Sequence, residues 1–317
     1  MKSNDLKMEA LVVKSTGNEY ILRTNDGKII IASLKGNFRI KDLKSTNPIA
    51  VGDRVKYESI NNDFWITNIM ERKNYIIRKS KNLSKKIHII ASNIDLLMII
   101  VSMKMPKTPL GFIDRFLLTA EAYGVPAMIV FNKYDIYKEK EILEMQELFE
   151  LYNSMGYKCI YASATENINT NLIIDELKDK TNLIAGASGV GKSSLINVIQ
   201  PHLNLKTANI SNFNEKGKHT TSFAEMYPLT FGGNIIDTPG IRSFGILNFK
   251  LPEIAHFFPD MKKYINNCKY SNCIHMYEPN CAIIEALDKG EIKASRYASY
   301  LSIIQEFEEA GIDYKYD

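Results

Sequence analysis

The fold is decided by one glycine-rich loop, Gly186-Ala187-Ser188-Gly189-Val190-Gly191-Lys192-Ser193. The loop follows the apolar segment NLIA (182–185) and precedes the helix-like segment 193–200. It therefore matches GxxxxGK[ST] in the strand–loop–helix setting that a phosphate-binding loop (P-loop) requires. Its glycines let backbone N–H groups turn toward phosphate oxygens, and the helix start adds a positive dipole end. We expect Lys192 to reach the β- and γ-phosphates and Ser193 to ligate Mg²⁺, with Ser194 beside them in the nucleotide site.

A second nucleotide-binding element is the segment from Asp237 to Gly240, DTPG, which follows the short strand-like segment NIID. A carboxylate at a strand end opposite the P-loop can hold the Mg²⁺ shell, and the Gly240 N–H can sense the γ-phosphate. DTPG alone is an ordinary turn sequence. Paired with a P-loop, it predicts a nucleoside triphosphatase switch.

The segment Asn132-Lys133-Tyr134-Asp135 predicts that the base is guanine. It follows the strand-like run AMIVF. The Asp135 carboxylate can accept hydrogen bonds from the N1–H and the exocyclic amine of guanine, whereas adenine would leave it unpaired. A site of that kind discriminates by roughly 10⁴-fold or more. We expect Lys133 to lie along the base and Asn132 to tie this loop to the P-loop.

The order of these elements is unusual. Ser163 and Ala164, which follow the run KCIYA, suit a backbone loop that contacts the guanine O6. Both this loop and NKYD precede the P-loop, whereas GTPases ordinarily begin with the P-loop. The GTPase fold can be kept only if the chain is circularly permuted, which is tolerated when the original termini lie close together at the surface.

The switch threonine should lie between Ser193 and Asp237, where GKHTTS (217–222) offers Thr220 and Thr221. We favour Thr221 as the Mg²⁺ ligand, and Thr220 remains the alternative. Ile241 stands where many GTPases place a water-orienting glutamine, so another group must do this work. His219 is the catalytic candidate nearest in sequence, although an ordinary surface histidine is the alternative.

Three cysteines and a histidine cluster near the end of the chain, with the spacing Cys268-x₄-Cys273-x-His275-x₅-Cys281. Three thiolates and one imidazole complete a tetrahedral Zn²⁺ shell, which predicts one structural zinc ion rather than a catalytic one. Buried thiols without a metal are the alternative. The fourth cysteine, Cys159, lies in a strand-like segment and is expected to be a small core residue.

The first 70 residues read as a small barrel of the OB type, because about five short strands fall within 60 residues without helical periodicity. Residues 1–90 carry 18 Lys/Arg and 9 Asp/Glu, whereas the remainder carries 22 and 27. This basic half suggests a polyanion partner, with a solvated basic surface as the alternative. Five aromatic residues could stack on bases or fill the barrel core: Tyr20, Phe38, Tyr57, Phe64 and Trp65.

The rest of the chain divides into regions with different patterns of apolar and polar residues. Alternating apolar runs and amphipathic segments after residue 90 predict a doubly wound α/β domain. We expect an OB-fold domain at 1–70, a basic linker at 71–90, a circularly permuted GTPase domain at 91–245, and a zinc-binding domain with a helical tail at 246–317. The absence of a secretory signal or a long apolar span favours a cytoplasmic protein.

The sequence resembles the ribosome small-subunit-dependent GTPase A (RsgA) family over nearly its whole length. The residues that carry the resemblance are NKYD, GASGVGKSS, GKHTTS, DTPGIRSFG and CKYSNCIHMYEPNC. Lys218 is a mild departure, since the family often has arginine there. The resemblance implies a GTP hydrolase that acts late in assembly of the small (30S) ribosomal subunit, binds GTP or GDP with Mg²⁺, and is stimulated by 16S rRNA.

The resemblance also implies that the barrel and the zinc lobe both contact rRNA, and we expect a monomer without a DNA or membrane partner. The alternative is an RNA-binding assembly chaperone in which nucleotide state only gates release. In the permuted chain, DTPG runs into the zinc lobe through a connection of about 20 residues. We therefore expect GTP-dependent movement of the switch to act on the zinc lobe.

Overall fold

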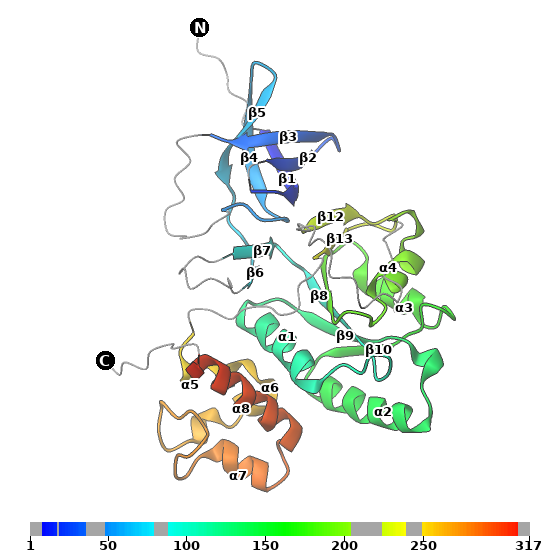
Figure 1. The fold of residues 1–317 in the computed structure, drawn as a ribbon. Coiled ribbons are helices and arrows are strands. Elements are labelled where there is room, and N and C mark those ends of the chain that lie inside the picture. The colour runs from blue at the N-terminus through cyan, green and yellow to red at the C-terminus, as the bar shows by residue number, and fades with distance from the viewer. Residues whose placement is uncertain are drawn as a thin grey trace.

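Among the residues that the structure describes, eleven strands form one continuous sheet that runs from the N-terminal barrel into the α/β domain, in the order β10-β9-β8-β11-β13-β12-β1-β2-β3-β5-β4. The computed structural model describes residues 8–17, 19–35, 48–78, 88–203, 224–238 and 249–309. The barrel and the C-terminal lobe lie at opposite ends of the α/β domain, as the ribbon shows (Figure 1). The predicted architecture of an N-terminal barrel, a central α/β domain and a C-terminal lobe with the Cys/His cluster is confirmed.

The described part of the barrel contains five short strands: β1 Met8–Ser15, β2 Tyr20–Thr24, β3 Ile29–Leu34, β4 Arg54–Ile60 and β5 Asp63–Ile69. It closes because β1 pairs with β4 as well as with β2. Alternate side chains point inward, so Tyr20, Tyr57 and Ile66 are buried in its core. Trp65 pairs with Ser33 of β3, one position away from the inward pair Ala32–Phe64, and therefore faces outward.

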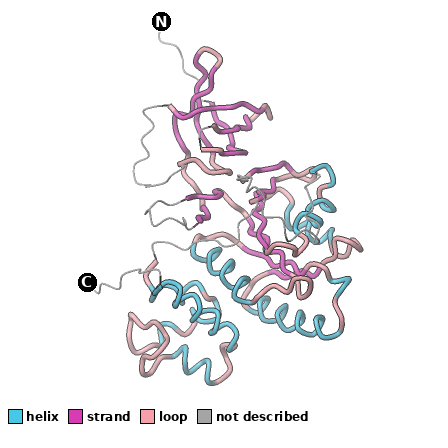
Figure 2. Tube along the Cα trace, in the orientation of Figure 1, coloured by secondary structure: helices cyan, strands magenta, loops and turns pink. Residues whose placement is uncertain are grey.

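The α/β domain alternates strands and helices, as Figure 2 shows in magenta and cyan. Its elements are β8 Leu96–Val101, α1 Leu110–Ala122, β9 Ala127–Phe131, α2 Glu139–Ser154, β10 Lys158–Tyr161, α3 Thr170–Leu177, β11 Thr181–Gly186, α4 Lys192–Ile199, β12 Glu225–Pro228 and β13 Asn234–Asp237. The strands β10, β9, β8, β11 and β13 are parallel, and β12 adds an antiparallel strand.

Strand β8 shows why this sheet needs helices on both faces, because all six of its residues are buried. Leu97, Ile99 and Val101 pack into the cluster that contains α1 and α2. Leu96, Met98 and Ile100 pack into the cluster that contains α3 and α4. A continuous aliphatic run is the sequence expected for a strand buried on both sides.

The circular permutation is visible in the sheet order. The strands β8, β9 and β10, which come first in the chain, lie on one side of β11, and β13 lies on its other side. The loops that follow β9, β10, β11 and β13 therefore leave from the same edge of the sheet, since the carboxyl ends of parallel strands coincide. That edge is where open α/β sheets bind their ligands.

Residues 71–90, expected as a linker, contain part of a hairpin formed by β6 Tyr75–Arg78 and β7 His88–Ser92. Asp53 of the barrel is fully buried beside it. Its carboxylate accepts hydrogen bonds from the Arg72 guanidinium (2.7 and 2.6 Å) and the Ser92 hydroxyl (2.6 Å). A buried carboxylate needs such partners, so this cluster fixes the barrel against the start of the α/β domain.

The C-terminal lobe is helical and has its own core. It comprises α5 Leu251–Ile254, α6 Pro259–Lys262, α7 Ala282–Asp288 and α8 Ala294–Glu309. The apolar stripe of α8 predicted at Tyr300, Ile303, Ile304 and Phe307 is buried, and Leu118 of α1 joins the same cluster. None of the helices that the structure describes is long and apolar enough to cross a membrane.

Candidate nucleotide site and metal centre

The P-loop connects β11 to α4 at the carboxyl edge of the sheet. Gly191 has a φ of +92°, and a Cβ built there would lie 2.4 Å from the Asn132 Nδ2, so only glycine fits. Lys192 begins α4, and its Nζ donates to the carbonyl oxygens of Gly186 (2.9 Å) and Ala187 (2.7 Å). The amine is therefore held over the loop, at the place where phosphate oxygens bind in P-loop proteins.

Lys192 and Asp237 lie close enough to influence each other's charge. Burial lowers the pKa of Lys192, and the Asp237 carboxylate partly reverses this. Burial likewise raises the pKa of Asp237, and Lys192 opposes that effect. Ser193 lies in the first turn of α4, so a hydroxyl and a carboxylate at this edge are both available to a Mg²⁺ ion.

Asn132 joins the NKYD loop to the P-loop, as the sequence predicts. Its side chain is buried, and its Nδ2 donates to the Val190 carbonyl at 2.9 Å. Its Oδ1 has no hydrogen-bond partner among the described residues. Lys133 has a φ of +68°, and its amine donates to the Met105 carbonyl oxygen. This donation was not anticipated from the sequence.

Asp135 is exposed, and its carboxylate is oriented by the neighbouring loop. The Ser163 hydroxyl donates to the Asp135 Oδ1 at 2.5 Å and accepts from the Glu166 N–H at 3.0 Å. The two loops are also joined through the Tyr134 N–H and the Ala162 carbonyl (3.0 Å). Ala164 follows Ser163 directly, so the second predicted base-contacting loop lies beside the first.

Four predicted site residues lie outside the described residues: His219, Thr220, Thr221 and Gly240. The structure brings the other nucleotide-site residues to the same edge of the sheet. It adds a further segment that the sequence analysis missed, the turn from Ser102 to Thr108. This turn follows β8 at the same carboxyl edge, and that position after a buried parallel strand was the available signal.

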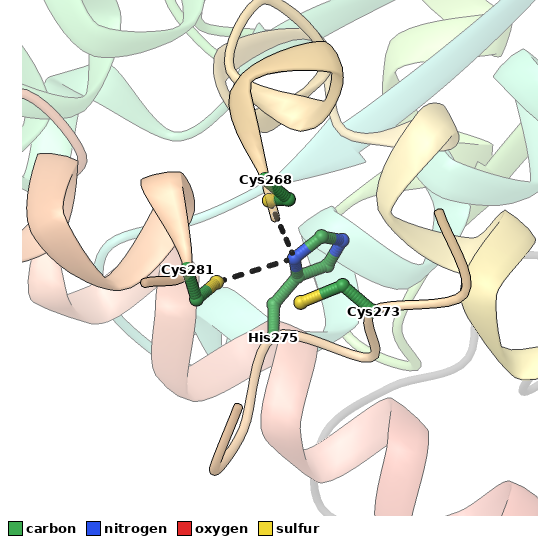
Figure 3. A group of neighbouring side chains, drawn as sticks. All are labelled: Cys268, Cys273, His275 and Cys281. Atoms are coloured by element: carbon green, nitrogen blue, oxygen red, sulfur yellow. Dashed lines mark hydrogen bonds between the residues drawn. The ribbon is translucent and has the colours of Figure 1, made fainter. Parts of the chain in front are cut away.

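The three cysteines and the histidine converge in the C-terminal lobe (Figure 3). Their ligand atoms all lie within 4.8 Å of one another, and all but Cys268 are buried. The Nδ1 of His275 lies 3.6 Å from the Cys268 Sγ and 3.4 Å from the Cys281 Sγ. In tetrahedral zinc sites with Zn–S of about 2.3 Å and Zn–N of about 2.0 Å, sulfur and nitrogen lie about 3.5 Å apart. The donor set and its spacing therefore fit a zinc ion.

The backbone around this cluster is held by side chains of the same lobe. The Tyr297 hydroxyl donates to the His275 carbonyl (2.7 Å), and the Tyr300 hydroxyl donates to the Ile274 carbonyl (2.8 Å). The Glu278 carboxylate accepts the N–H groups of Ile274 (2.6 Å) and Met276 (3.0 Å). Burial lowers the pKa of His275 to about 4, so its imidazole is neutral at pH 7 and able to ligate a metal.

Comparison with known proteins agrees with this geometry. The RsgA GTPase family model matches residues 69–247. A protein of Phocaeicola vulgatus named small ribosomal subunit biogenesis GTPase RsgA is 49% identical over 304 residues, covering 95% of this chain and 98% of that protein. A protein of Flavobacterium johnsoniae with the same name is 49% identical over 306 residues, covering 95% and 94%.

Solved structures show the same arrangement. YjeQ from Thermotoga maritima superposes with a TM-score of 0.75 at 32% identity, covering 96% of this chain and 99% of that one. YloQ, described as a circularly permuted GTPase, superposes with a TM-score of 0.72 at 27% identity, covering 99% and 100%. This chain therefore belongs to the RsgA family of GTPases.

Proposed function

We propose that this chain hydrolyses GTP on the small ribosomal subunit late in its assembly, and that the 16S rRNA of the subunit stimulates hydrolysis. The observation that carries the proposal is the meeting of three predicted loops at one sheet edge, with Asn132 bonded to Val190 and Ser163 bonded to Asp135. The choice of the small subunit as partner rests on the relatives, which are named for small ribosomal subunit biogenesis. We further propose that the chain acts in the cytoplasm as a monomer, on RNA rather than DNA.

Each loop has a distinct task in this proposal. The P-loop N–H groups and Lys192 bind the β- and γ-phosphates, and the Gly240 N–H senses the γ-phosphate. Asp135, oriented by Ser163, accepts the two donors of guanine, and Lys133 lies along the base. Mg²⁺ would be held by Ser193, Asp237 and Thr221, with Thr220 as the alternative to Thr221, and would neutralise charge on the phosphates.

The attacking water needs a group to orient it, and we assign this task to His219, since Ile241 cannot form a hydrogen bond through its side chain. Without rRNA to fix this histidine, turnover should be slow, about 10⁻⁴ to 10⁻² per second. The Cys/His cluster would hold one structural Zn²⁺ through Cys268, Cys273, His275 and Cys281. All four positions are then protein ligands, which leaves none for catalysis.

The barrel is the proposed first contact with rRNA because its end of the chain is basic. Of the aromatic candidates there, Tyr20 and Tyr57 fill the barrel core and Phe64 packs against it, whereas Phe38 lies outside the described residues. Trp65 faces outward from β5 and is the aromatic residue that we propose for stacking on a base.

The test is GTP turnover measured with purified small subunits, with large subunits, and without either. We expect stimulation by small subunits that weakens as salt rises, since phosphate contacts release counterions. A His219→Ala variant should bind GTP and the subunit but lose the stimulated turnover. Tight, nucleotide-dependent binding of the subunit without any stimulation would instead support the assembly chaperone.

A further inference from the structure

Tyr137 lies between the NKYD loop and the turn from Ser102 to Thr108 that follows β8, and its hydroxyl is hydrogen-bonded to both. It follows the short helical turn Tyr134–Ile136 and is buried, 8% exposed. The hydroxyl donates to the Asn132 carbonyl at 2.5 Å and accepts from the Met103 N–H at 2.8 Å. The same hydroxyl therefore donates to one loop and accepts from the other.

Both of these loops contact the P-loop. Asn132 reaches the Val190 carbonyl through its Nδ2. The turn that contains Met103 continues to Met105, whose carbonyl accepts from Lys133, and to Pro106. A Cβ built on Gly189 would lie 3.1 Å from the Pro106 Cδ, so this turn packs directly on the P-loop.

The turn is otherwise shaped by its own side chains. The Thr108 hydroxyl accepts from the Ser102 N–H (3.0 Å), and the Ser102 hydroxyl donates to the Lys104 carbonyl (2.6 Å). These bonds do not join the turn to the NKYD loop. The Tyr137 hydroxyl makes that connection at the buried end, and the amines of Lys104 and Lys133 add bonds at the outer end.

We propose that the Tyr137 hydroxyl is a positioning group that keeps the guanine-reading loop in register with the P-loop, so that base and phosphates are bound together. The inference rests on the proposed nucleotide site. Burial also raises the pKa of Tyr137, which keeps the phenol protonated and able to donate to Asn132. Phenylalanine would fill the same volume but leave the Asn132 carbonyl and the Met103 N–H without this partner.

The experiment compares Tyr137→Phe with Tyr157→Phe. Tyr157 is buried in the same apolar cluster, and its hydroxyl donates to the Glu121 Oε1 at 2.9 Å. It precedes β10 at the opposite edge of the sheet, so Y157F removes a buried tyrosine hydroxyl and one hydrogen bond without touching the nucleotide loops, whereas Y137F removes two hydrogen bonds. Affinity is measured with a fluorescent GDP analogue, turnover with small subunits, and stability by thermal unfolding without nucleotide.

We expect Y137F to bind GDP and GTP about tenfold more weakly, whereas Y157F binds them as the unchanged chain does. The KM for GTP should rise in Y137F while kcat at saturating GTP stays within about twofold, since the hydroxyl does not touch the reacting atoms. Both variants should lose thermal stability, and Y137F should lose more because it leaves two buried backbone groups without this partner. Amide exchange of Met103 in the GDP complex should accelerate in Y137F and not in Y157F.

Two results of the binding and turnover measurements would overturn the positioning role: Y137F affinity equal to that of Y157F, or a fall in kcat with KM unchanged. A Met103 amide that exchanges equally fast in all three proteins would also contradict it. Failure of the unchanged chain to bind any guanine nucleotide would instead refute the nucleotide site itself, which keeps the two failures distinct.

Discussion

In the proposed nucleotide site, the Asp135 carboxylate is the group that would select guanine over adenine. It lies at the sheet edge with Ser163 donating to its Oδ1, which leaves further lone pairs for the two donors of guanine. In Asp135→Asn an amide N–H would meet the guanine amine, whereas xanthine presents a carbonyl at that position. We expect GTP affinity to fall by at least about 100-fold and xanthosine triphosphate to become the preferred ligand.

The affinities for GTP and for xanthosine triphosphate are measured by competition against a fluorescent analogue of GDP or of xanthosine diphosphate. Asp175→Asn is the matched control, because Asp175 is an exposed carboxylate on α3 away from the loops. Retention of GTP preference in D135N would show that another group reads the base.

At the scale of single residues, the predictable part of the site is the part encoded within one short segment. The spacing within GASGVGKS and NKYD defines a loop geometry, so the position of Lys192 at the start of α4 and the hydrogen bond of Asn132 to the P-loop follow from local sequence. Tyr137 and Met105 could not be predicted in this way. Tyr137 contacts Met103 across 34 residues, and Met105 accepts from Lys133 across 28 residues, and no local pattern encodes such contacts.

Helix α8 is fastened to the α/β domain by Arg296, which is 2% exposed. Its guanidinium contacts the Asp114 carboxylate of α1 and donates to both oxygens of Asp260 (3.0 and 2.9 Å). Arg296→Ala would leave two carboxylates without their cation, one of them fully buried. We expect the free energy of unfolding to fall by about 3–5 kcal/mol, measured with denaturant.

Arg115→Ala is the control for this clamp, since Arg115 also pairs across α1 and α8, with the half-exposed Glu306. That surface pair should contribute less than about 1 kcal/mol. Equal losses in R296A and R115A would mean that the buried cluster contributes no more than an exposed pair.

The Cys/His cluster should depend on its metal. We expect Cys273→Ser to abolish zinc binding and to lower the thermal stability of the C-terminal lobe, because the loops between the ligands have little apolar core of their own. GDP binding should persist, since the nucleotide loops lie at the carboxyl edge of the α/β sheet and not in the C-terminal lobe. Metal analysis, thermal unfolding and GDP titration measure these effects.

Cys159→Ala is the control for the metal, because Cys159 is a buried thiol of β10 outside the cluster. Burial raises the pKa of this thiol to about 12, as expected for a core residue. Full zinc content in C273S, or none in C159A, would contradict the assignment of the ligands.

At the scale of elements, uniform or strictly periodic segments were predictable, and β8 and α8 are examples. The hairpin β6–β7 was not, because its strands are only four and five residues long and β6 lies within the basic run 72–86, which we interpreted as a linker. The strands themselves, YIIR and HIIAS, contain the isoleucine and tyrosine residues that favour extended structure. The bridge from β1 to β12 was also missed, because Lys14 and Glu225 are 211 residues apart.

The whole molecule is joined in two different ways. The C-terminal lobe is fixed to α1 through a buried ionic cluster. The barrel is held by the Asp53–Arg72 ion pair and also continues the sheet, through the pair Lys14–Glu225 (2.9 Å) and a hydrogen bond from Arg23 to Asn234. Val13 of β1 shares a core cluster with Met226 and Ile236. The expected action of the switch on the zinc lobe stays a prediction. The continuous sheet offers a second path, along which a change of nucleotide state could reach the barrel.

Strand β12 connects that second path to the proposed switch. It begins just after residues 204–223, which hold the proposed switch threonine, and it pairs with β13, which ends at Asp237. A shift of either segment between the GTP and GDP states would therefore move β12 and the strand β1 that pairs with it. The measure of this coupling is a ratio of affinities: the affinity for small subunits with a GTP analogue bound, divided by the affinity with GDP bound.

We expect Lys14→Glu to reduce this ratio by about threefold or more, because it replaces an attraction across the junction by a repulsion between the introduced carboxylate and that of Glu225. The double variant Lys14→Glu with Glu225→Lys should restore it. Lys28→Glu is the control, since Lys28 pairs with Asp26 in the exposed turn between β2 and β3, away from the junction, and its change alters the barrel charge equally. K28E should weaken rRNA binding in both nucleotide states alike, because lost phosphate contacts carry no nucleotide dependence. An unchanged ratio in K14E, together with normal binding, would mean that nucleotide state does not reach the barrel through this junction.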